Sequence, residues 1–546
     1  MFYLLSFLWL VREMKGLLFW LYLWQLKEYH IGRFKAHFHT AKGKQLLVNK
    51  ILIIKIALAF GIGLAFIDFS FFLPFILLGI VGVFILYFLE AVKFFKDWQE
   101  KRLKKPVLTK KTLILISVGL LLEILFLFVL YKNLRQTISY FTFYLLIFDI
   151  FTPVIISFVV LFFQPLTILW RIWTIRKAKK KRKELKNLLV IGITGSYGKT
   201  STKEFLAKIL SEKFGNEKVG KTKGHQNSEV GISRCLLNDI RPEHKFFVVE
   251  MGAYNRGGIK LLCDIIKPQI GILTGISEQH LATFGSQENI IKTKFELIEA
   301  LPENGTAILN GDNRYIRSKI GSFLGEGKIR VKNRIFYSTK EKLDVWAEEV
   351  RVGKKGLSFR VVTREGKRTD IKSALIGRQN VENLLGAICA ACQLKMNLKE
   401  ISQAIEKIKV EDAGVKLVKG RFNILDSSYS ANPDGVIADL DYLTLWEGKK
   451  AIIMPSLIEL GTAARQVHWR IGKKIGKVCD LAIITTRDYF EEIRQAAVGE
   501  GMASDKVLCL ESPSSILEKV RDFEGSNDII LIEGRVGRAI VDELKK

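Results

Sequence analysis

The stretch Asn187-Leu-Leu-Val-Ile-Gly-Ile-Thr-Gly-Ser-Tyr-Gly-Lys-Thr-Ser201 joins an apolar run to a glycine-containing loop. The residues that follow place Phe205, Leu206, Ile209 and Leu210 at the spacing of one helix face. A strand, a glycine loop and a helix in this order form a phosphate site, because the loop amides and the helix N-terminus face the anion. The sequence therefore predicts an α/β domain that binds a nucleotide.

The residues of this loop have separate predicted roles. Gly195 and Gly198 allow backbone N–H groups to surround phosphate oxygens, and Lys199 adds a positive charge at the outer phosphates. The Thr200 hydroxyl is placed to reach Mg²⁺. The spacing departs from the general Walker pattern, because Gly192 lies six residues before Gly198 instead of five. The strand and helix on either side still favour a nucleotide site over a loop without a ligand. The predicted nucleotide-binding residues of the loop are Gly195, Ser196, Gly198, Lys199, Thr200 and Ser201.

The composition excludes several classes of protein. The chain has 546 residues and a net charge of +29, and 49% of its residues are hydrophobic, which excludes a small binding module and a polar disordered chain. All six cysteines follow residue 230 at uneven spacing, which argues against a secreted disulfide framework and favours a reducing compartment. Cys389 and Cys392 form a C-x-x-C in an apolar stretch without a second pair, so we expect core packing rather than a metal or redox site.

The first 187 residues contain four apolar segments that are long enough to cross a bilayer, at about 20 residues for each crossing. These segments are Ile51–Ile67, Phe71–Leu89, Leu113–Tyr131 and Tyr140–Leu161. The stretches 33–50, 93–111 and 171–186 are basic, whereas 68–70 and 132–139 are short and carry little charge. Because basic loops stay in the cytoplasm, we expect a multi-pass protein of the cytoplasmic membrane with everything from Asn187 onward in the cytoplasm.

Charged residues inside these apolar segments raise further possibilities. Phe2 to Trp24 is interrupted by Arg12, Glu13 and Lys15, which suits a helix in the membrane interface at least as well as a fifth span. No small-residue cleavage site follows it, so we expect it to be retained. Glu123 and Asp149 fall near the middle of their spans, where either a protonated acid or a transport or headgroup role remains open. The basic runs adjoin the spans and lack interleaved aromatic residues, so no nucleic-acid partner is expected.

Two residues beyond the loop are candidate metal ligands. A second apolar strand from Phe246 ends on Glu250, and a third, Ile270–Ile276, is followed by Ser277-Glu-Gln-His280. Side chains just past the ends of parallel strands lie in the crevice where open α/β sheets bind ligands. Together and downstream of a phosphate loop, Glu250 and His280 favour a metal site over ordinary surface residues.

The last third predicts two more pieces of sheet. Residues 341–374 alternate apolar and polar side chains between glycine-containing turns, as antiparallel strands do. After Lys419, apolar strand segments recur at 422–425, 451–454, 481–485 and 529–532, which predicts a separate Rossmann-like α/β domain with a mostly parallel sheet. We therefore expect three parts: a transmembrane helical region with a basic linker at 1–187, an ATP-binding domain at 188–412 and a C-terminal domain at 413–546.

Several motifs, in this order, resemble the central domain of the Mur ligase family. They are Thr194-Gly-Ser-Tyr-Gly-Lys-Thr-Ser, Asn227-Ser-Glu-Val-Gly, Val249-Glu-Met-Gly-Ala, Glu278-Gln-His-Leu-Ala-Thr-Phe-Gly-Ser, Lys292-Thr-Lys-Phe-Glu and Leu309-Asn-Gly-Asp. The resemblance covers residues 188–546 and is greatest to the members that add D-alanyl-D-alanine to a UDP-linked muramoyl peptide. It implies an ATP-dependent acid–amino acid ligase of peptidoglycan precursor synthesis that works through an acyl phosphate.

The resemblance also implies roles for individual residues of the central domain. Lys199 and Thr200 would hold the ATP phosphates and a first Mg²⁺ together with Glu250, and His280 would bind a second Mg²⁺. Lys294 matches the family lysine that reacts with CO₂ to form a carbamate, which supplies the oxygen ligand that a hard cation prefers. Asn310 and Asp312 would lie near the nucleoside. Asn227 would contact substrate, although Ser228 replaces the usual second asparagine.

The C-terminal motifs carry further implied roles. Gly420-Arg421 and Asp426-Ser-Ser-Tyr-Ser-Ala-Asn-Pro-Asp are similar to the start of the Mur C-terminal domain, where Arg421 and Asp426 would meet ATP after the domains close. Arg421 suits developing phosphate charge. The residues matched to substrate contacts are Tyr429, Asn432, Glu459 and His468. Gln379 replaces a family histidine and Glu533 a family lysine, for which Arg538 could compensate.

Three functions are compatible with the sequence. The leading one is a peptidoglycan-type ligase that joins a muramoyl peptide, or another carboxylate, to an amino acid or dipeptide at the lipid bilayer. The membrane region takes the place of the usual uridine-nucleotide domain, which favours a lipid-linked or membrane-delivered acceptor. A second possible ligase function is that of a membrane-bound polyglutamate synthase. An ATP-driven transporter or scaffold is the third, motivated by Glu123 and Asp149.

Overall fold

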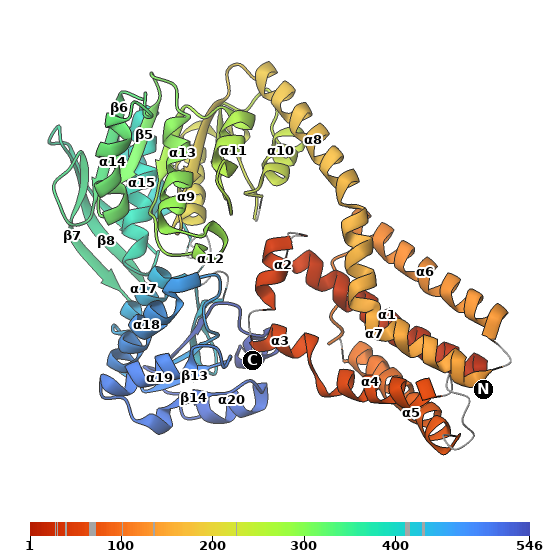
Figure 1. Ribbon diagram of the computed structural model, residues 1–546. Helices are drawn as coiled ribbons and strands as arrows, with labels where there is room; N and C mark the ends of the chain where they lie inside the picture. The colour runs from red at the N-terminus through yellow and green to blue at the C-terminus, as the bar shows by residue number, and fades with distance from the viewer. Residues whose placement is uncertain are drawn as a thin grey trace. The chain divides into compact units, whose positions relative to one another are not determined.

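The computed structural model describes residues 1–27, 29, 31–38, 41–64, 73–100, 102–134, 137–224, 226–409, 415–428 and 432–545. These residues form two compact units, Met1–Trp170 and Arg171–Lys546 (Figure 1). The sequence placed its first border at 187/188, within the second unit. The other predicted border, 412/413, and the predicted outward loop 68–70 lie outside the described residues.

The first unit consists of helices. They are α1 (Phe2–Leu26), α2 (Ile31–His37), α3 (Ala41–Leu47), α4 (Lys50–Gly63), α5 (Leu73–Gln99), α6 (Lys110–Leu134), α7 (Ile138–Phe162) and the start of α8 (Gln164–Glu184). Four helical stretches are long and apolar enough to cross a membrane, namely 43–63, 73–99, 110–134 and 138–184. Many large apolar side chains on them are exposed, including Phe60, Leu78, Phe128 and Phe158.

Helix α1 lies inside this bundle. Its residues pack against α5, α6 and α7. The indole N–H of Trp9 donates to the Leu145 carbonyl at 2.9 Å, and that of Trp24 donates to the Ser157 hydroxyl at 3.0 Å. Both indoles are buried. Helix α1 therefore contacts neighbouring helices on several sides.

A nine-stranded sheet forms the first part of the second unit. Its strands are β1 (Leu189–Thr194), β2 (Val219–Lys221), β3 (Phe246–Glu250), β4 (Ile270–Leu273), β5 (Thr306–Asn310), β6 (Asn333–Ser338), β7 (Val345–Gly353), β8 (Gly356–Thr363) and β9 (Arg368–Ser373). Their order is β2-β3-β1-β4-β5-β6-β7-β8-β9. All neighbours are parallel up to β7, and β7, β8 and β9 are antiparallel. The predicted α/β domain and its antiparallel end are confirmed.

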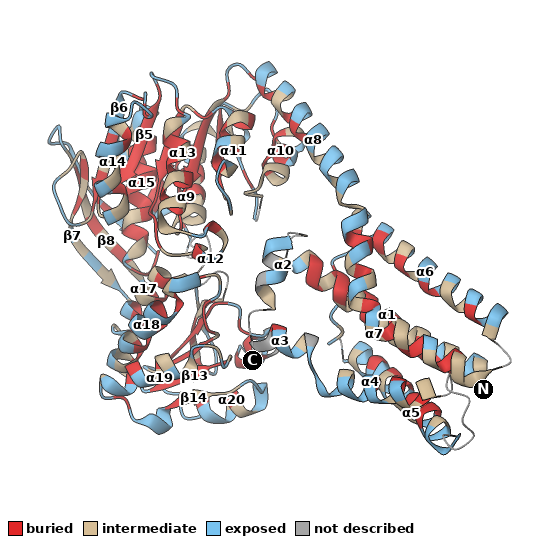
Figure 2. Cartoon of the chain, viewed as in Figure 1, coloured by how far each residue is buried: buried red, intermediate tan, exposed pale blue. Residues whose placement is uncertain are grey.

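Helices cover both faces of this sheet, because strands buried on both sides need an apolar layer on each. One core joins Ile191 and Ile193 to α9 (Lys199–Phe214), α15 (Gln379–Gln393) and α16 (Leu398–Glu406). The other joins Val190 to the opposite helices. These are α10 (Glu229–Asn238), α11 (Gly258–Ile266), α13 (Gln287–Glu299) and α14 (Arg314–Gly325). Strands β1 and β4 are buried almost throughout, and Figure 2 shows buried residues predominating in the part of the sheet drawn beside α13 and α15. Cys389 lies in the first core and all six cysteines are free, which confirms core packing.

A six-stranded sheet forms the C-terminal part, in the order β10-β11-β15-β12-β13-β14. Its elements are β10 (Lys416–Lys419), β11 (Asn423–Ser427), α17 (Pro433–Leu443), β12 (Lys450–Met454), α18 (Ala464–Val478), β13 (Leu481–Ile484), α19 (Phe490–Gly499), β14 (Val507–Cys509), α20 (Pro513–Val520), β15 (Ile529–Glu533) and α21 (Arg538–Leu544). Only β10 runs antiparallel to its neighbour. The mostly parallel sheet is confirmed, with edge strands β10 and β14 in addition to those predicted.

Candidate functional site

The loop between β1 and α9 is held tightly by the ends of neighbouring elements. Gly198 caps α9 in the left-handed region at φ 74°, where a side chain is strained. A Cβ on Gly198 would lie 2.4 Å from Asn383 Oδ1, and one on Gly195 would lie 2.1 Å from Thr274 Oγ1. The Ser196 amide donates to the Gly275 carbonyl at 2.7 Å. Both loop glycines are therefore required by close contacts.

A threonine and a carboxylate meet at the start of α9. The Thr200 hydroxyl donates to Glu250 Oε2 at 2.9 Å, and the Asn227 amide donates to Glu250 Oε1 at 3.1 Å. Glu250 ends β3, which pairs with β1 so that Ile193 lies opposite Glu250. The parallel register therefore brings together three residues that are separated in the sequence.

Two lysines of α9 lie beside this carboxylate. Lys199 Nζ donates to the Ser196 carbonyl at 3.2 Å, and burial lowers the pKa of Lys199 although Glu250 opposes the shift. Lys203 Nζ lies 3.7 Å from Glu250 Oε2 and 2.9 Å from Glu204 Oε1, and its side chain is buried. Lys203 was not predicted, although it follows Lys199 by one helical turn.

Lys294 lies on α13 and is 3% exposed. Burial is the main cause that lowers the pKa of Lys294 to about 7, and the positive charge of Lys199 lowers it further. Because only an unprotonated amine can react with CO₂, this environment suits the chemistry of a lysine carbamate. The pKa effect of Lys199 also indicates that Lys294 lies within electrostatic reach of the phosphate loop.

His280 pairs with Glu459, which lies in the segment after β12 of the C-terminal part. Its Nδ1 lies 2.6 Å from Glu459 Oε2, and the Ala282 amide donates to the Glu459 carbonyl at 3.1 Å. Both His280 and Glu459 have φ of 67°, which is uncommon for residues other than glycine. Burial lowers the pKa of His280, although Glu459 opposes the shift. A carboxylate on Nδ1 keeps the proton there and leaves the Nε2 lone pair for a metal.

These donors fit a divalent cation that is held mainly by oxygen atoms. Within the described part of the chain, no three His, Cys, Asp or Glu side chains come together as a ready-made metal site. Mg²⁺ normally keeps several waters and takes one or two carboxylates plus substrate phosphates. Thr200 and Glu250 fit one such ion. His280 and a carbamate on Lys294 would fit a second one.

A network of amides surrounds the outer side of the loop. Asn310, at the end of β5, donates to the Thr274 carbonyl at 2.8 Å and to Glu382 Oε2 at 3.0 Å. Asn313 donates to the Tyr197 hydroxyl at 3.1 Å. These contacts fix the position of Tyr197 within the loop. No role was predicted for Tyr197, although it lies in the quoted loop motif, or for Glu382 and Asn313.

Asp312, which was expected near the nucleoside, binds a neighbouring turn. Its Oδ1 accepts from the Ser338 hydroxyl at 2.5 Å, and its Oδ2 accepts from the Thr339 amide at 2.7 Å and the Thr339 hydroxyl at 2.8 Å. Its own amide donates to Asn310 Oδ1 at 3.0 Å. In this structure the Asp312 carboxylate therefore stabilises the turn after β6.

The start of α15 contacts both the phosphate loop and the C-terminal sheet. Asn383 lies against Gly198, and its amide donates to Asn380 Oδ1 at 3.1 Å. One turn earlier, Gln379 donates to Asp439 Oδ1 of α17 at 3.1 Å. Arg378 occupies the N-cap of α15, so both asparagines lie within the helix and do not cap it.

Arg421 and Asp426, expected to meet ATP, are paired within the C-terminal part. Arg421 Nη2 lies 2.6 Å from Glu524 Oε1, and the arginine is largely exposed. Asp426 Oδ2 accepts from Lys545 Nζ at 2.6 Å. Burial of Asp426 raises its pKa, but hydrogen bonds from Lys545 and Ser428 outweigh this and keep the pKa below its usual range. Lys545 was not predicted, because 119 residues separate it from Asp426.

Of the residues matched to substrate contacts, His468 is a correction. It is 0% exposed, its Nε2 accepts from the Leu457 amide at 2.9 Å, and its Nδ1 donates to the Ala464 carbonyl at 2.7 Å. Burial lowers the pKa of His468. With both nitrogens bonded and no exposure, His468 cannot touch substrate in this structure. It holds the segment that leads to Glu459.

The other matched substrate residues differ in what surrounds them. Asn432 caps α17, where its Oδ1 accepts from the Gly435 amide at 2.9 Å. Tyr429 lies outside the described residues, and the side chain of Arg538 is not among the described ones. Asn227 and Glu459 contact Glu250 and His280 as given above.

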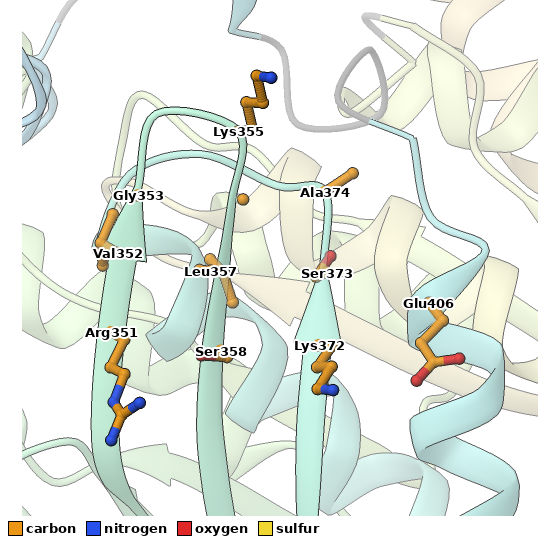
Figure 3. Close-up of a pocket in the computed structure, with 11 residues that line it drawn as sticks. Arg351, Val352, Gly353, Lys355, Leu357, Ser358, Lys372, Ser373, Ala374 and Glu406 are labelled. Atoms are coloured by element: carbon orange, nitrogen blue, oxygen red, sulfur yellow. The ribbon is translucent and has the colours of Figure 1, made fainter.

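A surface pocket elsewhere contains none of the predicted site residues. It lies at the ends of β7, β8 and β9, where Figure 3 shows Arg351, Lys372 and Glu406 around it. A second pocket is lined by Arg421, Phe422, Leu517, Arg521 and Glu543. The second pocket contains Arg421, but neither pocket contains Lys199, Glu250, His280 or Lys294, so the candidate site is defined by the strand ends and the contacts between them.

Comparison with known proteins agrees with this geometry. Residues 193–391 match the Mur ligase middle domain. The chain is 33% identical over 296 residues to the UDP-N-acetylmuramoyl-tripeptide–D-alanyl-D-alanine ligase of Synechocystis sp., over 52% of this chain and 59% of that protein. The chain thus spans less than two thirds of the length of that relative.

Solved structures show the same fold. MurF from Acinetobacter baumannii superposes with a TM-score of 0.60 at 24% identity, over 69% of this chain and 81% of that one. The MurF ligase of Thermotoga maritima in complex with ADP superposes with a TM-score of 0.55 at 25% identity, over 68% and 83%. The chain therefore carries a Mur ligase middle domain within a MurF-like α/β fold and is similar in sequence to D-alanyl-D-alanine-adding ligases.

Proposed function

We propose that this protein is an ATP-dependent ligase that joins a carboxylate of a peptidoglycan precursor to an amine. The observation that carries the proposal is the contact of Thr200 and Asn227 with Glu250 beside the loop that holds Lys199. This arrangement provides a cation, a hydroxyl and a carboxylate at the place where a triphosphate and its metal would bind. The family match and the ADP-bound relative support it.

The first step joins two anions, so the protein must offset their repulsion. In the proposed reaction a substrate carboxylate oxygen attacks the γ-phosphorus of ATP, the bond to the β-phosphate oxygen breaks, and an acyl phosphate and ADP result. Lys199 and the loop amides would stabilise the phosphate charges. When bound, Mg²⁺ would neutralise further charge on the phosphates, held by Thr200 and Glu250 on one side and by His280 and Lys294 on the other.

The second step needs an amine and the exclusion of water. The amine attacks the acyl carbon, phosphate leaves, and the amine loses a proton. Water would compete for the same carbon, so the C-terminal part has to cover the intermediate. The contacts of Glu459 with His280 and of Asp439 with Gln379 support such a covering role.

We propose a muramoyl peptide as acceptor and D-alanyl-D-alanine or a related amine as donor. The curated relative is a tripeptide–D-alanyl-D-alanine ligase. Two replacements, Gln379 and Glu533, lie near the contact between the two sheets, and Glu533 is buried there. The amine is therefore the part of the substrate in which we expect a difference from relatives.

We propose further that the first unit is a membrane region of five helices, with α1 as the fifth. Helices α1 and α6 run antiparallel, because Tyr3 and Tyr131 bond at one end and Gln25 and Val107 at the other. This direction puts the basic segments 27–50 and 93–111 at the same end of the bundle, where Lys111 lies 3.6 Å from the Tyr29 ring centre. Basic ends remain in the cytoplasm, which would place the ligase there.

A membrane position makes a lipid-linked or membrane-delivered acceptor the natural substrate. The test uses full-length protein in lipid nanodiscs with ATP, Mg²⁺, and either soluble UDP-muramoyl tripeptide or its lipid-linked form. A panel of amino acids and dipeptides supplies the amine, and mass spectrometry identifies the products. We expect amide formation that disappears in Lys199→Ala. Phosphate release from ATP without carboxylate or amine would contradict the ligase, and equal turnover of both acceptors would contradict only the lipid-linked preference.

A further inference from the structure

Buried acids outnumber buried cations inside the helical bundle. Among the described residues, six ionisable side chains meet between α1, α4, α5, α6 and α7. The cations are Arg12 and Lys55, and the acids are Glu13, Glu90, Glu123 and Asp149. A further pair, Lys15 and Asp97 at 2.8 Å, balances itself. Arg12 and Glu90 are partly exposed, so the fully buried groups are the cation Lys55 and the acids Glu13, Glu123 and Asp149.

The two cations form ion pairs with two of the acids. Arg12 pairs with Glu90 and lies 3.1 Å from Asp149 Oδ1, and Lys55 Nζ lies 2.6 Å from Asp149 Oδ2. The side chains of Asp149 and Lys55 are almost fully enclosed. Neither Glu13 nor Glu123 forms an ion pair among these residues, although Arg12 lies within electrostatic reach of Glu13.

Glu13 and Glu123 lie at facing positions of the α1–α6 contact, and Glu13 is also within electrostatic reach of Asp149 and Arg12. A Cβ on Gly119 would lie 2.6 Å from Leu17 Cδ1, which fixes this pair in register. The helices are antiparallel, so one turn before Leu17 meets one turn after Gly119, and these positions are Glu13 and Glu123. The neighbouring contact of Trp9 with Phe126, with ring centres 5.9 Å apart, keeps the same register.

Neither carboxyl is satisfied by its protein surroundings. Glu123 is 1% exposed and both of its oxygens are buried without a hydrogen-bond partner. Glu13 is 0% exposed; its Oε2 accepts from the Thr152 hydroxyl at 2.5 Å, while its Oε1 has no partner. The Tyr87 hydroxyl is also buried nearby without a partner. Three carboxyl oxygens of the two acids are therefore buried without a hydrogen-bond partner, and the Asp149 carboxyl lies beside Glu13.

Two bare carboxylates at this place are not stable. Burying an unpaired charge is so costly that the group takes up a proton or a counter-ion instead. An apolar pair of residues would pack the same contact at no such cost. The acids are therefore explained by a ligand with positive charge.

We propose that Glu13 and Glu123 form an enclosed cation site that holds one proton or one small monovalent metal ion. Thr152 and Tyr87 supply hydroxyl oxygens beside it, and Arg12, Lys55, Glu90 and Asp149 form the charged frame. This site is separate from the ligase chemistry and does not depend on it. A cation bound here stabilises the α1–α6 contact, and its release leaves two repelling acids.

The test uses full-length protein in nanodiscs and dicyclohexylcarbodiimide, a lipid-soluble reagent that modifies protonated carboxyls. Mass spectrometry locates the label. We expect it on Glu123 or Glu13 and not on Glu90 or Asp149, which are ion-paired. Labelling should fall about tenfold for each pH unit once the pair has lost its proton.

At one fixed pH, added salt shows whether the bound cation is a proton or a metal ion. Protection by Na⁺ or Li⁺ identifies a metal ion, whereas labelling that ignores salt but falls with pH identifies a proton. Glu123→Gln should leave Glu13 as the only labelled residue, and Glu90→Gln is the matched control in the same bundle. In buffer free of Na⁺ and Li⁺, wild-type protein with no label on either acid, or with equal label on Glu90 and Asp149, would overturn the proposal, and this result requires no variant to fold.

Discussion

The two sheets of the second unit hold their site residues in different states. At the ends of β1 and β3, Thr200, Asn227 and Glu250 already bond to one another. In the C-terminal sheet, Arg421 and Asp426 are paired with Glu524 and Lys545 instead. The phosphate- and metal-binding residues, here called the assembled side, are therefore in contact before substrate arrives. Arg421 and Asp426, here called the covering side, would have to leave Glu524 and Lys545 to reach ATP.

Lys199→Ala tests the assembled side and has the largest expected effect. Removing this buried cation should lower the rate of product formation by about 10³-fold, at the upper end for one electrostatic contact. The assay measures ATP-dependent amide formation by the full-length protein. Lys208→Ala, on the same helix but paired with Glu212 at the surface, is the control and should be nearly silent. A loss below tenfold for Lys199→Ala would contradict the assignment.

Lys294→Ala should lower activity by about 10²-fold, and a short carboxylate added to the assay should restore part of it. Because the pKa of Lys294 is about 7, the amine is protonated below that pH and available to CO₂ above it. Wild-type activity should therefore rise between pH 6 and pH 8 and respond to bicarbonate. Lys292→Ala, on the exposed side of the same helix, provides the control. Activity of Lys294→Ala equal to wild type would show that no carbamate is needed.

Arg421→Ala separates the two sides most directly. If the arginine acts only after it leaves Glu524, kcat should fall by about tenfold to 10²-fold while the Kd for ATP stays unchanged. Glu524→Ala removes the competing partner and should not lower kcat. Stopped-flow and equilibrium binding of ATP distinguish these cases. An equal change in Kd would mean that Arg421 already contacts the nucleotide in the open state.

Glu459→Gln weakens the link between the sides through His280. Loss of a carboxylate that orients a metal-binding imidazole typically costs about 10-fold to 100-fold in metal affinity. We expect the Mg²⁺ concentration needed for half-maximal activity to rise by about tenfold. At saturating Mg²⁺ most activity should return. A variant whose Mg²⁺ dependence is unchanged would place Glu459 outside the metal site.

His468→Leu has the smallest expected effect on catalysis. It leaves the buried Leu457 amide without its acceptor, which should lower the free energy of unfolding by about 1–3 kcal/mol. Activity per folded molecule should fall only a few-fold, through the loop that carries Glu459. Thermal unfolding measures the first effect, with a change at exposed Trp469 as control. Loss of amine specificity without loss of stability would indicate that His468 contacts substrate directly.

Local patterns predicted the assembled side well. The loop Gly195–Lys199 and the carboxylate Glu250 follow buried strands, and parallel pairing puts such strand ends together. The apolar lengths of α5, α6 and α7 were also visible as simple runs. These features depend on neighbours in the chain and on one general rule of sheet geometry.

Contacts between distant residues could not be predicted in the same way. His280 and Glu459 are 179 residues apart, and Trp9 and Leu145 are 136 apart, so no periodic pattern connects them. Strands β10 and β14 have four and three residues, too few for a hydrophobic alternation to stand out. The burial of His468 depends on how α18 packs, which its sequence neighbours do not specify.

The first turn of α15 connects the phosphate loop to the C-terminal part. Asn383 touches the loop at Gly198, and Gln379, four residues earlier, bonds to Asp439. A packed helix moves as a nearly rigid unit, so a displacement at one end also displaces the other end. Binding of a triphosphate at the loop would thus reach the C-terminal part through one helical turn. Inserting one residue in that turn would rotate Asn383 by about 100° relative to Gln379, so that the two contacts could no longer be made together.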